Sequence, residues 1–390
     1  MNTELNTKRG KLLTATLIAL AGAGVQQAVA GPEFQVGEQG SMQITYALQM
    51  MMEKKEYTSA NDDGDSFDTF LRRNRVTFSG QYNDYIGFYA QFEAGNDSKN
   101  GNDDRGVYYR DAYLTLDKSD AVRFIAGRYK NTFSRENLEA CLEPLTMDRS
   151  SLLAYSPYGA SRDTGVTMWG NLLDAKLQYR IGVNDGREGE AVVKDNPRIT
   201  GRVHASLIDP EYNYGYRGTY LGTQTVLTIG AAVDMQKDIA YDDNSTRTGS
   251  KDYRATTYDI FYEQPFSFGT VTTSAAVFDY SLDGYAIIAD PTLSPYTERE
   301  GNYLKMGYML PNPVGQGRLQ LFARNEQVEY DEGTGLSNRS LTALGAHYYI
   351  NGQSLKVSLE HASHGFDIEN DSDASLQDHK QTTLSLQMIF

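Results

Sequence analysis

Residues 41–52 read SMQITYALQMMM and alternate between polar and apolar side chains. The even positions carry the larger apolar groups: Met42, Ile44, Tyr46, Leu48, Met50 and Met52. The odd positions carry small or polar groups: Ser41, Gln43, Thr45, Ala47 and Gln49. Successive side chains of a β-strand point to opposite faces, so the pattern predicts one long strand with an apolar and a polar face. Its length and its strongly apolar face favour a strand between lipid and a wet lumen over a strand of a soluble sandwich.

The same alternation recurs along the chain, in stretches of about ten residues that are separated in turn by short and long connections. It predicts sixteen strands: 40–52, 70–81, 85–94, 107–116, 121–129, 163–170, 175–184, 198–208, 223–236, 254–264, 269–281, 301–310, 317–329, 340–350, 354–363 and 381–390. Most long connections are acidic, and 209–222 is the one long connection among the short turns. Sixteen antiparallel strands with long loops at one rim and short turns at the other are typical of an all-β transmembrane barrel.

The N-terminal segment carries the features of an export signal. A basic start (Lys8, Arg9 and Lys11) precedes a short apolar run, and Ala28-Val29-Ala30 fits the small-residue rule for cleavage. We therefore expect a cleaved signal peptide over 1–30 and a single β-barrel domain over 31–390. The alternative, an N-terminal anchor helix, would need a longer apolar run.

The composition excludes several other classes of protein. The chain has 390 residues with 36 Lys and Arg against 51 Asp and Glu, and a net charge of −15 is unsuited to binding nucleic acid. A mean hydropathy of −0.52 excludes a polytopic helical membrane protein. The single cysteine, Cys141, excludes a disulfide framework and a cysteine-rich zinc site. The C-terminal amphipathic stretch ends on Phe390, which resembles the terminal strand signal of outer-membrane barrels.

Three stretches together resemble the phosphate-selective porin O/P family. They are FLRRNRVTFSG at 70–80, GRYKNTFS at 127–134 closing on MDRS at 147–150, and RDTGV at 162–166 running through to GVNDG at 182–186. The resemblance covers most of the mature chain. It implies a trimeric, sixteen-stranded porin of the Gram-negative outer membrane whose third loop folds inward to narrow the pore.

In this chain the inward loop would be residues 130–162. Its length and the resemblance predict that it builds the constriction. The candidate basic groups there are Lys130, Arg135 and Arg149, with Glu136, Glu139 and Glu143 as counter-charges.

Strand alternation also assigns charged residues to the lumen. The predicted lumen bases are Arg73, Arg75, Arg123, Lys176, Arg180, Arg202, Lys305, Arg318, Arg324 and Lys356. The predicted lumen acids are fewer: Glu93, Asp111, Asp234, Glu326 and Glu360. Trp169 and the many tyrosines are assigned to the aromatic girdles at the membrane interfaces. Bases in a narrow passage favour anions, whereas acids at the outer mouth are screened by salt. The alternative is that the bases only pair with lumen acids and stiffen the wall.

These features predict a porin for passive diffusion of small hydrophilic solutes, with a modest preference for anions such as phosphate or other oxyanions. The alternative is a barrel that sheathes or anchors a surface or electron-transfer partner such as a multihaem cytochrome. A sheath needs a wide lumen, and the long third loop argues against it. The expected partners are outer-membrane lipid and lipopolysaccharide, two further copies of the chain in a homotrimer, and small anions as solutes.

No cofactor, metal or catalytic group is expected. The chain has five histidines and shows no Ser/His/Asp spacing that indicates an enzyme. His361 and His364 are three residues apart, so on one strand they point to opposite faces and cannot chelate together. The acidic loops lack the twelve-residue calcium-loop pattern.

Overall fold

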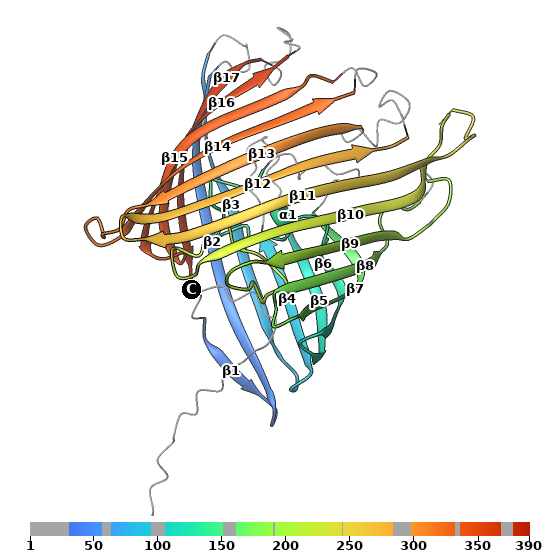
Figure 1. The fold of residues 1–390 in the computed structure, drawn as a ribbon, viewed down its shortest axis with the longest axis horizontal. Coiled ribbons are helices and arrows are strands. Elements are labelled where there is room, and N and C mark those ends of the chain that lie inside the picture. The colour runs from blue at the N-terminus through green and yellow to red at the C-terminus, as the bar shows by residue number, and fades with distance from the viewer. Residues whose placement is uncertain are drawn as a thin grey trace, which may run out of the picture.

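The computed structural model describes residues 31–56, 64–94, 106–150, 161–189, 192–243, 245–283, 298–331, 336–367 and 377–390. Sixteen strands, β2 to β17, pair antiparallel with their sequence neighbours, and β17 (His379–Ile389) pairs with β2 (Gly40–Lys55) to close the sheet. Figure 1 shows these strands running obliquely around a barrel. The predicted sixteen-stranded all-β barrel is confirmed.

The fourteen remaining barrel strands follow one another around the wall. They are β3 (Ser66–Gln81), β4 (Ile86–Ala94), β5 (Val107–Ser119), β6 (Val122–Lys130), β7 (Arg162–Leu172), β8 (Leu177–Asn184), β9 (Arg198–Ser206), β10 (Val226–Ala240), β11 (Lys251–Phe266), β12 (Gly269–Ser281), β13 (Arg299–Met309), β14 (Arg318–Tyr330), β15 (Arg339–Asn351) and β16 (Leu355–Phe366). Several strands extend beyond their predicted ends because pairing continues into the loops, as between Lys55 and Ser66. No helix in the described part of the chain has the length and apolar character needed to cross a membrane.

The two faces of the wall differ in the way that the alternation predicts. On β8, Ile181 and Val183 point outward and are about half exposed, at 49% and 50%, whereas Arg180 points inward and is fully buried. In a water-soluble protein so many exposed aliphatic side chains would form a large apolar surface that promotes aggregation. On a barrel wall they are the surface that contacts lipid.

A short strand that the alternation did not predict, β1 (Glu33–Val36), pairs with the start of β2. It lies next to the chain end, because Ile44 bonds to Pro32 on the side where Tyr46 bonds to Phe390. The rings of Tyr46 and Phe390 contact edge to face at 5.4 Å. β1 therefore pairs with the part of the β2 edge that lies beyond the end of β17.

Two segments fold into the lumen and supply most of its packed interior. The third loop follows β6, and of its residues the structure describes 131–150 and 161; it is buried from 131 to 147 and carries the short helix α1 (Arg135–Leu138). The Ser134 hydroxyl caps α1 by accepting a 3.0 Å hydrogen bond from the Asn137 N–H. The second segment, residues 207–225 between β9 and β10, is the long connection among the short turns, and we call it the long turn.

Candidate functional site: the constricted lumen

The third loop is tied to the wall on the far side of the lumen. The Leu142 carbonyl oxygen accepts hydrogen bonds from Lys356 Nζ on β16 at 3.0 Å and from Gln387 Nε2 on β17 at 2.9 Å. The Leu145 carbonyl oxygen lies 3.2 Å from His347 Nε2 on β15. Because the loop leaves the wall between β6 and β7, these contacts show that it crosses the lumen.

Two carboxylates of the loop reinforce this attachment with ion pairs. Glu136 on α1 pairs with Lys305 on β13, and both side chains are fully buried. Asp148 binds Arg72 at 2.7 Å and Arg73 at 2.8 Å, both on β3. Burial opposes ionisation of Asp148, but the arginines outweigh it and hold the pKa of that carboxyl well below its usual range. The loop is therefore fixed at both of its described ends.

A β-bulge explains how two consecutive arginines reach one carboxylate. Where β2 pairs with β3, Gln49 lies opposite Arg73 and Met50 lies opposite Leu71, which leaves Arg72 as an extra residue. A bulge disturbs the strict alternation of faces. Arg72 and Arg73 can therefore both reach into the lumen, although alternation alone places only Arg73 there.

The long turn enters the lumen from the other rim and meets the third loop. Arg135 binds both carboxylate oxygens of Glu211, and the Ala140 N–H donates to the Tyr216 carbonyl oxygen at 2.8 Å. Burial opposes ionisation of Glu211, but Arg135 outweighs it and lowers the pKa of this carboxyl. The sequence showed that this connection is long, and it carried no pattern that indicated an inward course.

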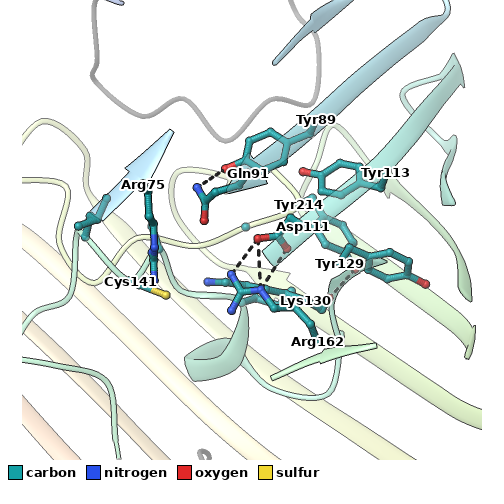
Figure 2. A pocket seen from close by; sticks show the side chains of 14 residues that line it. Arg75, Tyr89, Gln91, Asp111, Tyr113, Tyr129, Lys130, Cys141, Arg162 and Tyr214 are labelled. Carbon is teal, nitrogen blue, oxygen red and sulfur yellow. Dashed lines mark hydrogen bonds and ion pairs between the residues drawn. The ribbon is translucent and has the colours of Figure 1, made fainter. Parts of the chain in front are cut away.

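A cavity of about 70 Å³ lies between the third loop and the wall of β3 to β7 (Figure 2). Its lining residues are Arg75, Tyr89, Gln91, Asp111, Tyr113, Tyr129, Lys130, Leu138, Ala140, Cys141, Leu142, Arg162, Tyr214 and Gly215. The loop is bonded to β13 and β15–β17 on its other side. The cavity therefore marks a part of the constricted lumen that the loop leaves open.

Cations predominate among the described residues that line this cavity. The lining holds Arg75, Lys130 and Arg162 with one carboxylate, Asp111, and Arg75 also binds Glu93 just outside the lining at 2.9 Å. Arg162 holds Asp111 with hydrogen bonds of 3.0 to 3.2 Å, and Lys130 Nζ donates to the carbonyl oxygen of Glu139. Lys130 is thus held by a backbone carbonyl oxygen and not by a carboxylate.

Cys141 lies where several of these cations converge. Burial opposes ionisation of its thiol, but the surrounding cations outweigh burial and hold the pKa of the thiol well below its usual range. In order of effect they are Arg149, Lys130, Arg75 and Arg73. Several basic side chains therefore surround this thiol at the cavity.

The chain matches the family described as phosphate-selective porin O and P over residues 44–390. The chain belongs to this porin family. It is accordingly an outer-membrane porin of the Gram-negative type. No curated protein matches it.

Solved structures of other outer-membrane proteins share the fold at low sequence identity. The trimer form of Vibrio cholerae OmpT is 11% identical with a TM-score of 0.55, covering 90% of this chain and 100% of that one. An anion-selective porin from Comamonas acidovorans gives 12% and 0.56 with the same coverage. The outer-membrane channel DcaP of Acinetobacter baumannii gives 12% and 0.57, covering 93% of this chain and 100% of that one. At these identities the similarity shows the barrel fold alone.

In this porin most of the predicted lumen bases reach the lumen but hold a partner there. Arg202 binds Asp259 at 2.6 Å, and Arg324 binds Glu360 at 2.7 Å. Arg73 and Lys305 form ion pairs with carboxylates of the third loop, and Arg123 forms one with Asp120. Three further bases donate hydrogen bonds to backbone carbonyl oxygens: Arg180 and Arg318 to the long turn, and Lys356 to the third loop. Arg75 binds Glu93 at 2.9 Å and is the member of the predicted set that lines the cavity.

Two sequence-based placements are wrong. Lys176 lies in the turn 173–176 and is exposed, because three successive left-handed residues before it break the strand alternation. Trp169 is not a girdle residue: it points into the barrel at 1% exposure. Its ring lies 5.5 Å from that of Tyr214 and 4.9 Å from the guanidinium of Arg123.

The predicted constriction residues separate into two groups. Lys130 lines the cavity and Arg149 is the cation with the largest effect on Cys141, although Arg149 also donates to the carbonyl oxygen of Asn137 at 2.9 Å. Arg135 and Glu136 are buried in ion pairs that attach the loop. The other predicted counter-charges also lie inside, where Glu143 pairs with Arg217 of the long turn at 3.1 Å and Glu139 is buried.

Three basic residues at the site escaped the sequence analysis. Arg110 is the extra residue of a second bulge, between β4 and β5, and pairs with Glu93. Arg162 fell inside the predicted loop but begins β7. Arg198 binds Asp234 and Asp163 inside the barrel. Among the described residues, no group of three or more His, Cys, Asp or Glu is arranged to hold a metal ion.

Proposed function

We propose that this porin is a passive channel for small hydrophilic solutes with a modest preference for anions such as phosphate and other oxyanions. The observation that carries the proposal is Lys130, which lines the cavity beside the third loop and donates to a backbone carbonyl oxygen, whereas Arg75 and Arg162 there bind Glu93 and Asp111. A narrow passage between low-dielectric walls focuses such a field on passing ions. Arginine suits oxyanions because its planar fork donates two parallel hydrogen bonds and stays charged.

The pairing of most other lumen bases limits the expected selectivity. Arg202 and Arg324 are neutralised by buried carboxylates, so they contribute little net charge to a passing ion. These pairs fit the structural role that the sequence analysis kept as its alternative. The anion preference is therefore assigned to the residues around the cavity.

The filled interior favours a channel over a sheath for a redox partner. The third loop crosses the lumen and the long turn meets it through Arg135 and Glu211. A protein partner would have to displace both segments and their buried ion pairs. The sheath remains the second candidate and would be supported by a multihaem cytochrome that copurifies with the barrel.

Assembly and processing follow from the same proposal. We infer a homotrimer embedded in outer-membrane lipid and lipopolysaccharide, since a related fold is that of a porin trimer. Residues 1–30, which lie outside the described residues, are proposed to be a signal peptide cleaved before Gly31. Light scattering in detergent and N-terminal sequencing of the mature protein test the two points separately.

The channel proposal is tested by single-channel recording in a KCl gradient. The reversal potential should indicate anion preference, and Lys130→Gln should reduce it, because Lys130 lines the cavity. Lys194→Gln is the matched control, since it removes the same charge from a side chain that is 71% exposed in an outer loop. Cation preference in the unmodified protein, or equal effects of the two variants, would contradict the proposal.

A further inference from the structure

Four tyrosine rings form a continuous row along one side of the cavity. Tyr89 on β4 and Tyr113 on β5 stack with centroids 5.1 Å apart and planes 12° apart. Tyr113 meets Tyr129 on β6 edge to face at 6.3 Å, and Tyr129 meets Tyr214 of the long turn at 6.5 Å. All four rings line the cavity.

The strand register builds the accessible half of this row. Tyr89 lies directly opposite Tyr113 in the β4–β5 pair, and Gly127 lies opposite Tyr113 in the β5–β6 pair. A Cβ at Gly127 would lie 2.8 Å from the Tyr113 Cα, and its φ of +133° suits only glycine. Tyr129 and Tyr214 are buried, whereas Tyr89 and Tyr113 are only partly buried. A solute would therefore meet the stacked pair.

Two of the cations lie across the cavity from the stacked pair. In Figure 2 Tyr89 and Tyr113 lie in the upper part of the view and Lys130 and Arg162 in the lower part, with the Asp111 carboxylate between them on Arg162, and the guanidinium end of Arg75 reaches toward Cys141. Arg75 binds Glu93 through Nε at 2.9 Å. The site thus offers a flat apolar surface and a cationic surface to the same solute.

We propose that this cavity binds planar aromatic carboxylates, with the ring on the Tyr89–Tyr113 surface and the carboxylate toward Arg75, Lys130 and Arg162. The inference rests on the proposed anion channel and names a solute class for it. A hydrated inorganic anion gains only the electrostatic attraction. An aromatic anion also gains stacking and removes apolar surface from water, so the ring adds affinity at equal charge.

The test is inhibition of the KCl current by added anions in single-channel recordings. Benzoate should reduce the current at concentrations about tenfold lower than acetate, because the two share a carboxylate and differ by the ring. Benzyl alcohol, which carries the ring without the charge, should have little effect at the concentration where benzoate acts. Inorganic phosphate also lacks a ring. Once its larger charge is allowed for, it should inhibit the current no better than acetate.

Tyr113 provides the matched variants. Tyr113→Phe keeps the ring and should retain the benzoate effect, whereas Tyr113→Leu should raise the half-inhibitory concentration of benzoate about fivefold to tenfold and leave acetate unchanged. An unchanged heat-induced mobility shift on gels shows that both variants are folded.

The outcomes separate the two proposals. Anion preference with equal inhibition by benzoate and acetate overturns the aromatic site and leaves the channel proposal standing. Equal benzoate inhibition of Tyr113→Leu and the unmodified protein also overturns the site. Absence of anion preference overturns the channel proposal, and the aromatic site with it.

Discussion

Arg135 of the third loop donates two hydrogen bonds to Glu211 of the long turn, from Nη1 to Oε2 at 2.7 Å and from Nη2 to Oε1 at 2.8 Å. Both side chains are almost fully excluded from solvent. The guanidinium also lies over the rings of Tyr216 at 4.5 Å and Phe261 at 3.9 Å. This ion pair joins two segments that enter the barrel from opposite rims, so the position of each depends on the other.

Removing the carboxylate should therefore loosen the constriction. Glu211→Gln leaves the Arg135 charge buried without its partner, which costs about 3–5 kcal/mol. We expect noisier single-channel currents and a lower thermal unfolding temperature. Glu188→Gln, in an exposed part of an outer loop, is the control and should change neither. Quiet currents from Glu211→Gln would show that the loop is held without this pair.

Glu139 should make the anion preference depend on pH. Burial, followed by the Glu136 carboxylate, raises the pKa of Glu139 from 4.5 to about 8. The ionised form is thus disfavoured in the folded state, and the free energy of unfolding declines as pH rises from about 4.5 to 8. Around and above pH 8 a negative charge appears on the third loop inside the lumen, so the preference for anions should fall. Reversal potentials between pH 6 and pH 9 measure this change.

The matched variant for that experiment is Glu139→Gln. The substitution keeps the size of the side chain and removes the titrating carboxyl group. The hydrogen bond from Lys130 goes to the backbone carbonyl oxygen of residue 139, so it is kept as well. The reversal potential of the variant should change less across the same pH range. An identical pH profile in both proteins would assign the effect to another group.

Cys141 should react readily with anionic thiol reagents. It is the one cysteine of the chain, it lines the cavity, and surrounding cations favour its thiolate, which is the reactive form. A sulfonate-bearing methanethiosulfonate should reduce both the conductance and the anion preference, and it should react faster than its trimethylammonium analogue. Cys141→Ser should be insensitive to both reagents. Failure of the unmodified protein to react would mean that solutes of this size do not reach the cavity.

Arg202 and Lys130 should differ in what their loss changes. Arg202 binds the buried Asp259 at 2.6 and 2.9 Å. Arg202→Gln leaves that carboxylate without its ion-pair partner and should destabilise the barrel by about 3–5 kcal/mol. Its reversal potential should stay close to that of the unmodified protein, whereas Lys130→Gln should shift that potential with little loss of stability. Urea unfolding and reversal potentials measured on both variants give the comparison. A large shift in Arg202→Gln would restore it to the ion path.

The barrel wall was predictable because alternation acts on every residue of a strand. A stretch such as 41–52 has one lipid face and one lumen face, and closure of the sheet repeats this constraint sixteen times. The short strand β1 carries too few residues to show the pattern. The alternation gave the correct faces for Arg180 and Ile181, for example.

The interior was less predictable because its contacts join segments that are far apart in sequence. Glu136 and Lys305 are 169 residues apart, and no local pattern pairs them. The inward course of the long turn depends on Tyr216 and its neighbours finding partners inside the barrel, which sequence spacing does not reveal. Trp169 was misplaced for the same reason, since an aromatic residue fits either a membrane girdle or a packed lumen.

The two bulges also carry an evolutionary consequence. Each adds one residue to a strand, and the pairing on either side keeps its lipid and lumen faces. Arg72 and Arg110 thereby add charge to the inside without replacing any residue of the regular lumen face. An extra residue at such a bulge thus changes the charge of the lumen while the rest of the strand keeps the side chains that face lipid, so an inserted codon is a way to alter the pore without altering the barrel.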